Sequence, residues 1–385
     1  MISLGDLLYE FKDRAKPGES EPEVLTLTER NGFVAQRERF NKRLAVENTS
    51  KYKLIGMFDI AFNPYLLWAG AIAQNRHWDK GIISPLYPTF RAREGVDPNY
   101  LIRLLLTEDM IARYDTIAYG SVPRKRRTSV DDFLALQVPD LPPLPEQRRI
   151  AAILDLADTL RTKRKTALEF VTELERSSFD TAFGDPSSNR YGLPLGSIGD
   201  LVDSARYGTS QKSVPDGDVP VLRMGNLTMN GQIDIADLKY MNLAPGEVDR
   251  YTVVSGDILF NRTNSAALVG KTAVYRGERR MAYAGYLVRL RLKGDNEPAY
   301  VAGYLNSRHG KAVLRNMCKS IVGMANINAK ELQRIPILLA SPQCQRTYAR
   351  AVDAIERQRE TLERDAQALD DLFSALQSRA FRGEL

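Results

Sequence analysis

Hydrophobic residues recur at heptad spacing along two long stretches of the chain. The first stretch begins after the prolines of 141–145 and contains neither proline nor glycine until Gly184, and the second follows Pro342. Arg164 and Arg359 interrupt the two apolar series. The apolar positions are Ile150, Ile153, Ala157, Leu160, Ala167, Val171 and Leu174 in the first stretch, and Tyr348, Val352, Ile355, Leu362, Ala366, Leu369, Phe373, Leu376 and Ala380 in the second. Prolines favour a helix start, and this spacing predicts two long coiled-coil helices that pack antiparallel on each other.

The segments that precede these stretches have a different pattern, with short hydrophobic runs and frequent turn residues. Runs such as 252–254 and 257–260 predict strands, and the turn-rich segment 211–220 predicts a loop between strands. Helical patches such as 300–307 intervene. Each segment is therefore predicted to be an α/β (α+β) domain, and the pattern leaves its strand order open.

The chain repeats itself. Three matching pairs of segments are 3–7 with 197–201, 59–63 with 257–261, and 174–183 with 372–381, at offsets of 194, 198 and 198 residues. Three short matches in the same order indicate a tandem duplication with a pseudo-twofold internal repeat. The predicted parts are a first α/β domain over 1–144, a first long helix over 145–184, a second α/β domain over 185–340 and a second long helix over 341–385.

Composition and charge indicate a globular protein with a polyanionic partner. Hydrophobic residues make up 43% and charged residues 26% of the chain, and the net charge is +6. Residues 185–340 carry 20 Lys and Arg against 14 Asp and Glu, whereas residues 1–144 carry 20 against 19. An excess confined to one domain suits a polyanion, although ordinary surface charge would give the same balance.

The sequence also indicates where the protein works. It has no apolar run long enough for a membrane span and no secretory signal at Met1, so we expect a cytoplasmic protein without membrane contact. Cys318 and Cys344 are then expected to be reduced thiols.

Motifs for catalysis are largely missing. His77 and His309 are isolated and cannot form a zinc site with the two cysteines, and no phosphate-binding loop for ATP is present. Asn63-Pro64-Tyr65 is similar to part of an amino-methyltransferase motif but lacks its second proline, so a turn after a strand is the better interpretation. Trp78 beside His77 suits either base stacking or a core position. We expect no catalytic residue, no metal site and no cofactor in this chain.

Three polar stretches have the composition that DNA-groove contacts require. Arg and Lys contact phosphates or guanine, and Asn, Gln, Ser and Thr contact bases or backbone. A solvated surface loop is the alternative for each stretch, most of all for the basic run 124–127. The candidate residues are Arg124, Lys125, Arg126 and Arg127 in the first stretch, Arg206, Tyr207, Thr209, Ser210, Lys212, Arg223 and Asn226 in the second, and Asn261, Arg262, Thr263, Asn264 and Lys271 in the third.

Taken in order, these features resemble a known family. The junction Leu141-Pro-Pro-Leu-Pro-Glu-Gln147 resembles the start of the helical regions in specificity subunits of type I restriction–modification systems. The segments 256–264, 268–272 and 325–332 resemble the second half of that family's target-recognition domain. The second junction, Ser341-Pro-Gln-Cys-Gln345, departs from the first, so the two junctions are expected to differ. The first domain has no clear counterpart of 268–272.

The resemblance implies a DNA-binding subunit without its own catalytic centre. Such subunits recognise a bipartite double-stranded DNA target, one half per domain, with the helices setting the spacer. Two methyltransferase subunits bind the helical region, and restriction–translocase subunits join that complex. S-adenosylmethionine, ATP and Mg²⁺ are then expected on the partner subunits. The alternatives are the specificity part of a split type II-like restriction or methylation enzyme, and a structural coiled-coil adaptor.

Overall fold

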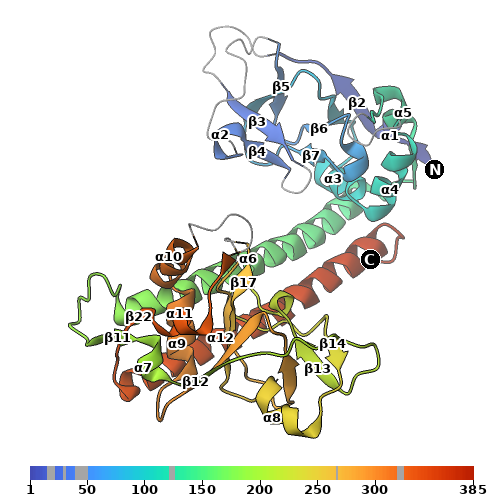
Figure 1. Ribbon diagram of the computed structural model, residues 1–385. Helices are drawn as coiled ribbons and strands as arrows, with labels where there is room; N and C mark the ends of the chain where they lie inside the picture. Colours follow the sequence, from blue (N-terminus) through green and yellow to red (C-terminus); the bar gives the residue numbers. More distant parts are fainter. Residues whose placement is uncertain (15–21, 29–31, 40–50, 121–125, 266–267, 319–324) are drawn as a thin grey trace. The chain divides into compact units, whose positions relative to one another are not determined.

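The computed structural model describes residues 1–14, 22–28, 32–39, 51–120, 126–265, 268–318 and 325–385. Two long helices, α6 (Leu144–Phe183) and α12 (Pro342–Ala380), each follow a mixed α/β domain (Figure 1). The chain divides into two compact units, Met1–Lys163 with Ala366–Leu385, and Arg164–Asp365. Each unit therefore contains one mixed domain and parts of both long helices, and each is described by itself below.

The first unit holds the N-terminal domain. Its strands are β1 (Ile2–Ser3), β2 (Leu8–Phe11), β3 (Glu23–Leu27), β4 (Phe33–Ala35), β5 (Lys53–Gly56), β6 (Ile60–Phe62), β7 (Ile72–Gln74), β8 (Lys80–Ile83), β9 (Thr89–Ala92) and β10 (Gln137–Val138). Its helices are α1 (Leu4–Leu7), α2 (Gln36–Arg39), the 3₁₀ turn η1 (Leu67–Ala69), α3 (Pro98–Leu105), α4 (Glu108–Thr116) and α5 (Val130–Ala135). The strands form the sheets β2-β9-β6-β7 and β4-β3-β8-β5 and the pair β1-β10.

The second unit holds the second domain. Its strands are β11 (Leu195–Ser197), β12 (Val202–Tyr207), β13 (Val219–Leu222), β14 (Lys239–Met241), β15 (Thr252–Val253), β16 (Ile258–Asn261), β17 (Thr263–Asn264), β18 (Thr272–Val274), β19 (Met281–Tyr283), β20 (Leu287–Leu292), β21 (Ala325–Asn326) and β22 (Pro336–Leu338). Its helices are α7 (Ile198–Leu201), the 3₁₀ turns η3 (Met224–Asn226) and η4 (Pro245–Glu247), α8 (Val248–Tyr251), α9 (Pro298–Asn306), α10 (Arg308–Met317) and α11 (Ala329–Gln333).

The strand order confirms the internal repeat. The second domain contains the sheets β12-β20-β16-β18 and β14-β13-β19-β15 and the pair β11-β22, which match the three sheets of the first domain strand for strand. Each domain has one parallel strand pairing within its four-stranded sheets, which is β3 with β8 in the first domain and β13 with β19 in the second. The other strand pairings in these sheets are antiparallel. The central strands β6 and β16 are buried throughout, as expected for strands covered on both faces.

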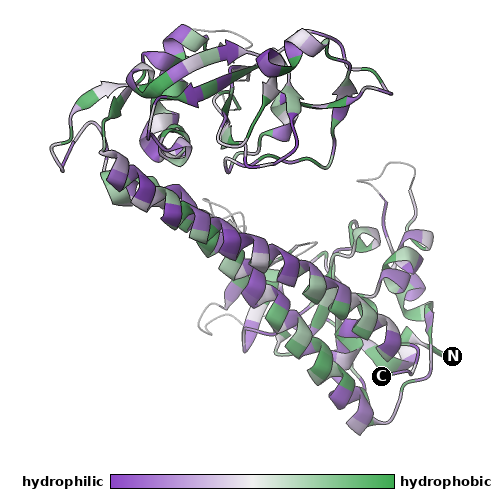
Figure 2. Ribbon diagram, turned by 90° about the horizontal axis from the view of Figure 1, so that it is seen from below, coloured by the Kyte–Doolittle hydropathy of each residue, from purple (hydrophilic) through white to green (hydrophobic). Residues whose placement is uncertain are grey.

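The two long helices run antiparallel within each unit, as the heptad pattern predicts. In the first unit Arg161 pairs with Asp370 at 2.6 Å, and in the second Arg164 pairs with Asp365 at 3.3 Å. Figure 2 shows hydrophilic and hydrophobic residues interleaved along both helices. Ile150 and Ala157 are buried in the seam, but Leu160 is 44% exposed. Leu174 is also exposed, because the seam of α6 is less regular than its sequence pattern.

A buried carboxylate ties each domain together in the same way. Asp257 accepts two hydrogen bonds from the Arg291 guanidinium, at 2.7 and 3.1 Å, and Asp59 accepts the equivalent pair from Arg91 at 2.8 and 3.2 Å. The hydrogen bonds that Arg291 donates to Asp257 raise the pKa of Arg291 above its ordinary value. Both carboxylates are nearly inaccessible to water, so the bidentate pairs are strong and geometrically specific.

A buried glutamine fixes the start of each long helix on its domain. Gln147 accepts a hydrogen bond from the Asp97 N–H at 2.8 Å and donates to the Pro142 carbonyl at 2.9 Å. Gln345 accepts from the Glu297 N–H at 2.9 Å and donates to the Ala340 carbonyl at 2.9 Å. The junctions are therefore equivalent at this residue, contrary to the expectation from their different sequences.

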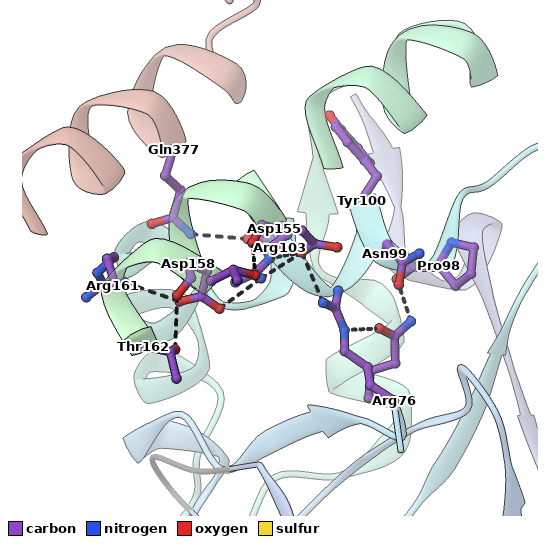
Figure 3. Close-up of polar contacts among 12 residues, drawn as sticks. Arg76, Pro98, Asn99, Tyr100, Arg103, Asp155, Asp158, Arg161, Thr162 and Gln377 are labelled. Atoms are coloured by element: carbon purple, nitrogen blue, oxygen red, sulfur yellow. Dashed lines mark hydrogen bonds and ion pairs between the residues drawn. The ribbon is translucent and has the colours of Figure 1, made fainter. Parts of the chain in front are cut away.

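Arginines bind the domains to the sides of the helices. Arg103 donates to Asp155 at 2.7 Å and to Asp158 at 2.9 Å, and Arg76 reaches the same Asp155 oxygen at 3.0 Å (Figure 3). In the second unit Arg276 pairs with Asp353 at 2.7 Å and with Glu356 at 3.0 Å. Arg76 and Arg276 lie in equivalent loops, after β7 and β18, and are 200 residues apart, whereas Arg103 lies in α3.

Candidate nucleic-acid interface

The second and third polar stretches meet at one end of the sheet β12-β20-β16-β18. Strand pairing places Tyr207 opposite Val288, Asn261 opposite Leu287 and Phe260 opposite Thr272, so β12 and β16 end where β20 and β18 begin. We call this end of the sheet, with residues 206–212, 261–264, 271 and 286, the polar edge. It brings together residues that are about 65 positions apart in the sequence.

Arg262 lies at the centre of the polar edge. Its guanidinium carbon is 4.8 Å from the centre of the Tyr207 ring, and Nη1 donates to the Gly285 carbonyl at 3.3 Å. Nε of Arg262 is buried and has no hydrogen-bond partner among the described residues. The backbone of Arg262 is held on both sides, since its N–H donates to the Tyr286 carbonyl at 3.0 Å and its carbonyl accepts from Ile327 at 2.9 Å. The partly exposed side chain is thus pre-positioned by its backbone and by the Tyr207 ring.

Two tyrosines flank this arginine. Tyr207 is 42% exposed, and its hydroxyl accepts a hydrogen bond from the Ala329 N–H at 2.9 Å, which fixes the ring. Tyr286 is 52% exposed and begins the turn into β20. A cation over an aromatic ring is stabilised by about 0.5–1 kcal/mol at an exposed site. The Tyr207 ring and the Tyr286 carbonyl therefore hold Arg262 in place, and no carboxylate among the described residues pairs with it.

Other predicted residues of the polar edge are open to solvent. Arg206, Ser210 and Lys212 are exposed, and Lys271 is half-buried. No ion pair is formed by these three cations with any carboxylate in the described ranges. The backbone of Asn264 lies in β17, opposite Ala325.

Four predicted residues instead have buried side chains that stabilise the loops. Asn226 accepts from the Arg223 N–H at 2.9 Å and donates to the Asp234 and Asp237 carbonyls at 2.8 and 3.0 Å. Thr263 donates to the Asn326 side chain at 2.9 Å. Thr209 accepts from the Gln211 N–H at 3.1 Å, and Asn261 donates to the Leu268 carbonyl at 3.4 Å. Buried polar groups of this kind are hydrogen-bonded internally, so these side chains shape the edge from below.

Arg223 is also occupied. Its guanidinium donates to the Asp237 carboxylate and to the Asp237 carbonyl, each at 2.9 Å. This contact lowers the pKa of Asp237 below its ordinary value. Arg223 follows β13, whose last residue Leu222 accepts a hydrogen bond from Ala284 at 2.9 Å, next to the polar edge.

In the first domain the basic run lies partly outside the described residues. Arg124 and Lys125 fall in that part of the chain. Arg126 forms an ion pair with Asp115 and lies 5.7 Å from the Trp68 ring, whereas Arg127 is exposed and lies 5.9 Å from the Tyr65 ring. The aromatic–arginine pairs thus occur in both domains, at the end of the equivalent sheet.

The loop after β6 is equivalent to the loop after β16. Thr128 donates to the Pro64 carbonyl at 2.9 Å, just as Ile327 donates to the Arg262 carbonyl. Gly70 and Gly270 both adopt positive φ, at 85° and 79°, a conformation that favours glycine. Asn63-Pro64-Tyr65 forms a turn in which the Asn63 side chain accepts from the Tyr65 N–H at 3.0 Å. The loop that seemed to lack a counterpart in sequence therefore has one in backbone structure.

Some features of these surfaces were missed in the sequence. Tyr286 follows a glycine between two strand patterns, which is a signal for an exposed turn residue. Lys311 and Arg315 of α10 were overlooked because they are dispersed among apolar residues. Trp78 packs on the core of the sheet β4-β3-β8-β5, and its backbone carbonyl accepts from Asn75 at 2.7 Å.

The described residues contain neither a metal-binding cluster nor a helix that could span a membrane. Within the described ranges no group of three or more His, Cys, Asp or Glu side chains could hold a metal ion. No helix of the described parts of the chain has the length and apolar character needed to cross a bilayer.

Comparison with solved structures defines the class of fold. The S subunit of a type I restriction–modification system from M. genitalium superposes with a TM-score of 0.63 over 98% of this chain and 95% of that one, at 13% identity. A chain from a structure of complex assembly and conformational transition in a type I R-M system gives 0.55 over 100% and 97%, at 19% identity. The fold is therefore that of type I S subunits.

Sequence comparison finds similarity to specificity subunits of type I restriction enzymes. Residues 194–369 match the family described as "Type I restriction modification DNA specificity domain". The EcoKI specificity subunit of Escherichia coli K12 is 24% identical over 66% of this chain, and the StySPI specificity subunit of Salmonella potsdam is 22% identical over 77%. The matched parts span 58% and 67% of those two proteins. The chain is therefore similar in sequence to type I restriction–modification specificity subunits, and the family match lies in its second domain and second long helix.

Proposed function

We propose that this chain recognises a bipartite double-stranded DNA target, one half-site per domain, and directs adenine methylation or cleavage by partner subunits. The observation that carries the proposal is the convergence of Arg262, Tyr207 and the exposed cations at the polar edge of the second domain. Arginine in a fixed position can form bidentate hydrogen bonds with guanine, and nearby cations can neutralise phosphates.

The residues of the polar edge then divide into two roles. Arg262 has a partly exposed side chain and a fixed backbone, which suits contact with a base edge. Arg206 and Lys212 are exposed on the flanking strand and loop, which suits contact with phosphates. The buried side chains of Asn226 and Asn261 hold the loops in shape. Asn264 and Lys271 complete the proposed contact surface.

The first domain is proposed to use the equivalent end of its sheet. Arg127 and Tyr65 lie at the end of the equivalent sheet, and the basic residues Arg124 and Lys125 precede Arg127 in the sequence. Pro64 stands where the second domain has Arg262. Because the two domains place different side chains on the same backbone, they are proposed to recognise different half-sites.

The long helices are the proposed binding surface for two methyltransferase subunits, which the restriction–translocase subunits then join. Exposed large hydrophobic residues on α6 and α12 support this assignment, since such residues on a helix surface suit a protein partner. They are Leu156, Leu160, Phe170, Leu174 and Leu372. S-adenosylmethionine, ATP and Mg²⁺ are proposed to bind to the partner subunits.

The test begins with methylome sequencing of cells that carry this chain and its partner subunits. We expect a methylated motif with two half-sites and a fixed spacer. In the Arg262→Ala variant, one position of one half-site should lose its preference, with a cost of about 1–3 kcal/mol in binding to the parent target. Arg279→Ala is the matched control, because Arg279 is exposed and precedes β19, away from the polar edge.

Two results would contradict the proposal. One is a continuous motif without a spacer. The other is an Arg262→Ala variant that keeps both the affinity and the sequence preference of the parent chain, as Arg279→Ala should.

A further inference from the structure

A pocket of about 900 Å³ lies within the second unit, bordered by β18, α9, α10 and the two long helices. Its acidic residues come from the long helices, for example Glu175 and Glu356, and several arginines accompany them. On the side formed by β18 and α10, the lining contains Lys271, Lys311 and Arg315. This side of the pocket is therefore basic, whereas the long helices contribute the acidic residues.

Lys311 is the central residue of this basic group. Its ammonium donates to the Gly270 carbonyl at 2.8 Å and to the Asn306 side-chain oxygen at 2.9 Å. Asn306 is itself oriented by a hydrogen bond to the Thr272 carbonyl at 2.8 Å, so its oxygen faces the lysine. An ammonium group has three N–H donors, and one remains unused here.

The charge of Lys311 has no counter-charge within the described residues. None of the carboxylates there lies within ion-pair distance of it. Burial, with Arg315 and Lys271 nearby, lowers the pKa of Lys311 to about 8. Buried charges are normally paired, because an unpaired one is costly to desolvate. An anion at this position would balance the charge of the half-buried Lys311.

The first domain shows what the fold itself requires at this site. Its α4 begins after Thr107 as α10 begins after Ser307, so Ile111 and Asp115 correspond to Lys311 and Arg315. The Ile111 side chain lies against Gly70, as Lys311 bonds to the equivalent Gly270. Ala71 stands where the second domain has Lys271. The same backbone is thus built with no cation at these three positions.

The basic group adjoins the polar edge. The Lys271 carbonyl accepts a hydrogen bond from the Asn261 N–H at 2.8 Å, and Asn261 directly precedes Arg262. The Lys271 backbone is therefore bonded to the residue next to Arg262. A DNA strand carries one phosphate per nucleotide, and lysine and arginine are its usual protein contacts.

We propose that Lys311, with Lys271 and Arg315, binds a backbone phosphate of the DNA strand that flanks the half-site of the second domain. This site rests on the proposed function, since it needs DNA at the polar edge. A phosphate oxygen accepts the unused N–H of Lys311, and Lys271 and Arg315 lie on either side. The contact is independent of base sequence and has no equivalent in the first domain.

The test is the salt dependence of DNA binding by the full chain. Duplexes with and without the target are titrated at several salt concentrations. Lys311→Met keeps the length of the side chain and removes the charge, and Arg315→Ala changes an exposed residue that should leave the fold intact. For each variant the slope of log affinity against log salt should become shallower by about 0.9 per lost phosphate contact. The loss should be equal on both duplexes, and the base preference should stay unchanged.

Lys239→Ala, at an exposed lysine of β14, is the matched control and should keep the parent slope. Folded Lys311→Met and Arg315→Ala variants with the parent slope would overturn the site. Parent slopes in these two variants, together with an altered base preference in Arg262→Ala, would rule out the phosphate site and leave the proposed function supported. If inorganic phosphate raises the Tm of the parent but not of Lys311→Met, while DNA binding is the same for both, the site takes free phosphate and the DNA assignment is wrong.

Discussion

The glutamine at the start of each long helix is the sharpest place to test how the domains are attached. Gln345 is inaccessible to water and satisfies the Glu297 N–H and the Ala340 carbonyl at once, each at 2.9 Å. Gln345→Ala removes the side-chain amide that bonds to both groups, so the Glu297 N–H and the Ala340 carbonyl are left buried without a partner. Each such group costs about 1–3 kcal/mol, so we expect a local loss of about 3 kcal/mol.

Hydrogen exchange measures this loss where it occurs. The Glu297 amide should exchange on the order of a hundredfold faster in Gln345→Ala than in the parent, because 1.4 kcal/mol corresponds to about tenfold. Gln343→Ala is the matched control, since Gln343 is exposed on the same turn of α12. In Gln147→Ala the faster exchange should move to Asp97 of the first domain.

Equal exchange at Glu297 in the Gln345→Ala and Gln343→Ala variants would refute the reasoning. It would mean that water or a shifted backbone satisfies both groups at little cost. Gln345→Glu separates the two halves of the contact. It retains an acceptor for the Glu297 N–H but cannot donate to Ala340, so it should lie between the parent and Gln345→Ala.

The other predictions concern buried charges. Asp257→Asn removes the carboxylate that Arg291 contacts, and urea denaturation should show a free energy of unfolding of the second unit that is lower by about 3 kcal/mol. Asp59→Asn should have the same effect on the first unit. A loss below about 0.5 kcal/mol would contradict this prediction. Lys311, with a pKa lowered to about 8, should make the parent more stable as pH rises from 8 toward the unfolded value near 10.5. Relative to Lys311→Met, the parent should gain up to about 3 kcal/mol over this range, and a pH-independent difference in Tm would show that the lysine is not desolvated.

The repeat and the heptads were sufficient to predict the general plan of the fold. Leucines and isoleucines at heptad spacing had no other stable arrangement, and the segment pairs at offsets of 194 and 198 fixed the duplication. The strand order was not predictable, because β3 and β8 pair across more than 50 residues of chain. Local patterns carry no information on such a pairing.

The contact residues were only partly separable by sequence. Asn226 and Arg262 both stand in polar turns after strands, and their types suit DNA equally well. In the structure the buried Asn226 side chain forms hydrogen bonds with three backbone groups, whereas the Arg262 side chain is partly exposed and bonds to the Gly285 carbonyl alone among the described residues. Loop backbones need side-chain partners as much as ligands do. Residue type alone cannot distinguish a side chain that stabilises a loop from one that is open to a ligand.

The paired Asp59–Arg91 and Asp257–Arg291 contacts have a consequence for how such a chain can evolve. After duplication, each domain is a descendant of one ancestral unit, and positions where both kept the same contact are constraints of the fold. Positions where they diverged, such as Pro64 against Arg262 or Ile111 against Lys311, show that the shared backbone tolerates different side chains there. If the proposed contacts hold, a change of specificity needs substitutions at such positions alone, and the paired carboxylate and arginine of each domain can stay as they are.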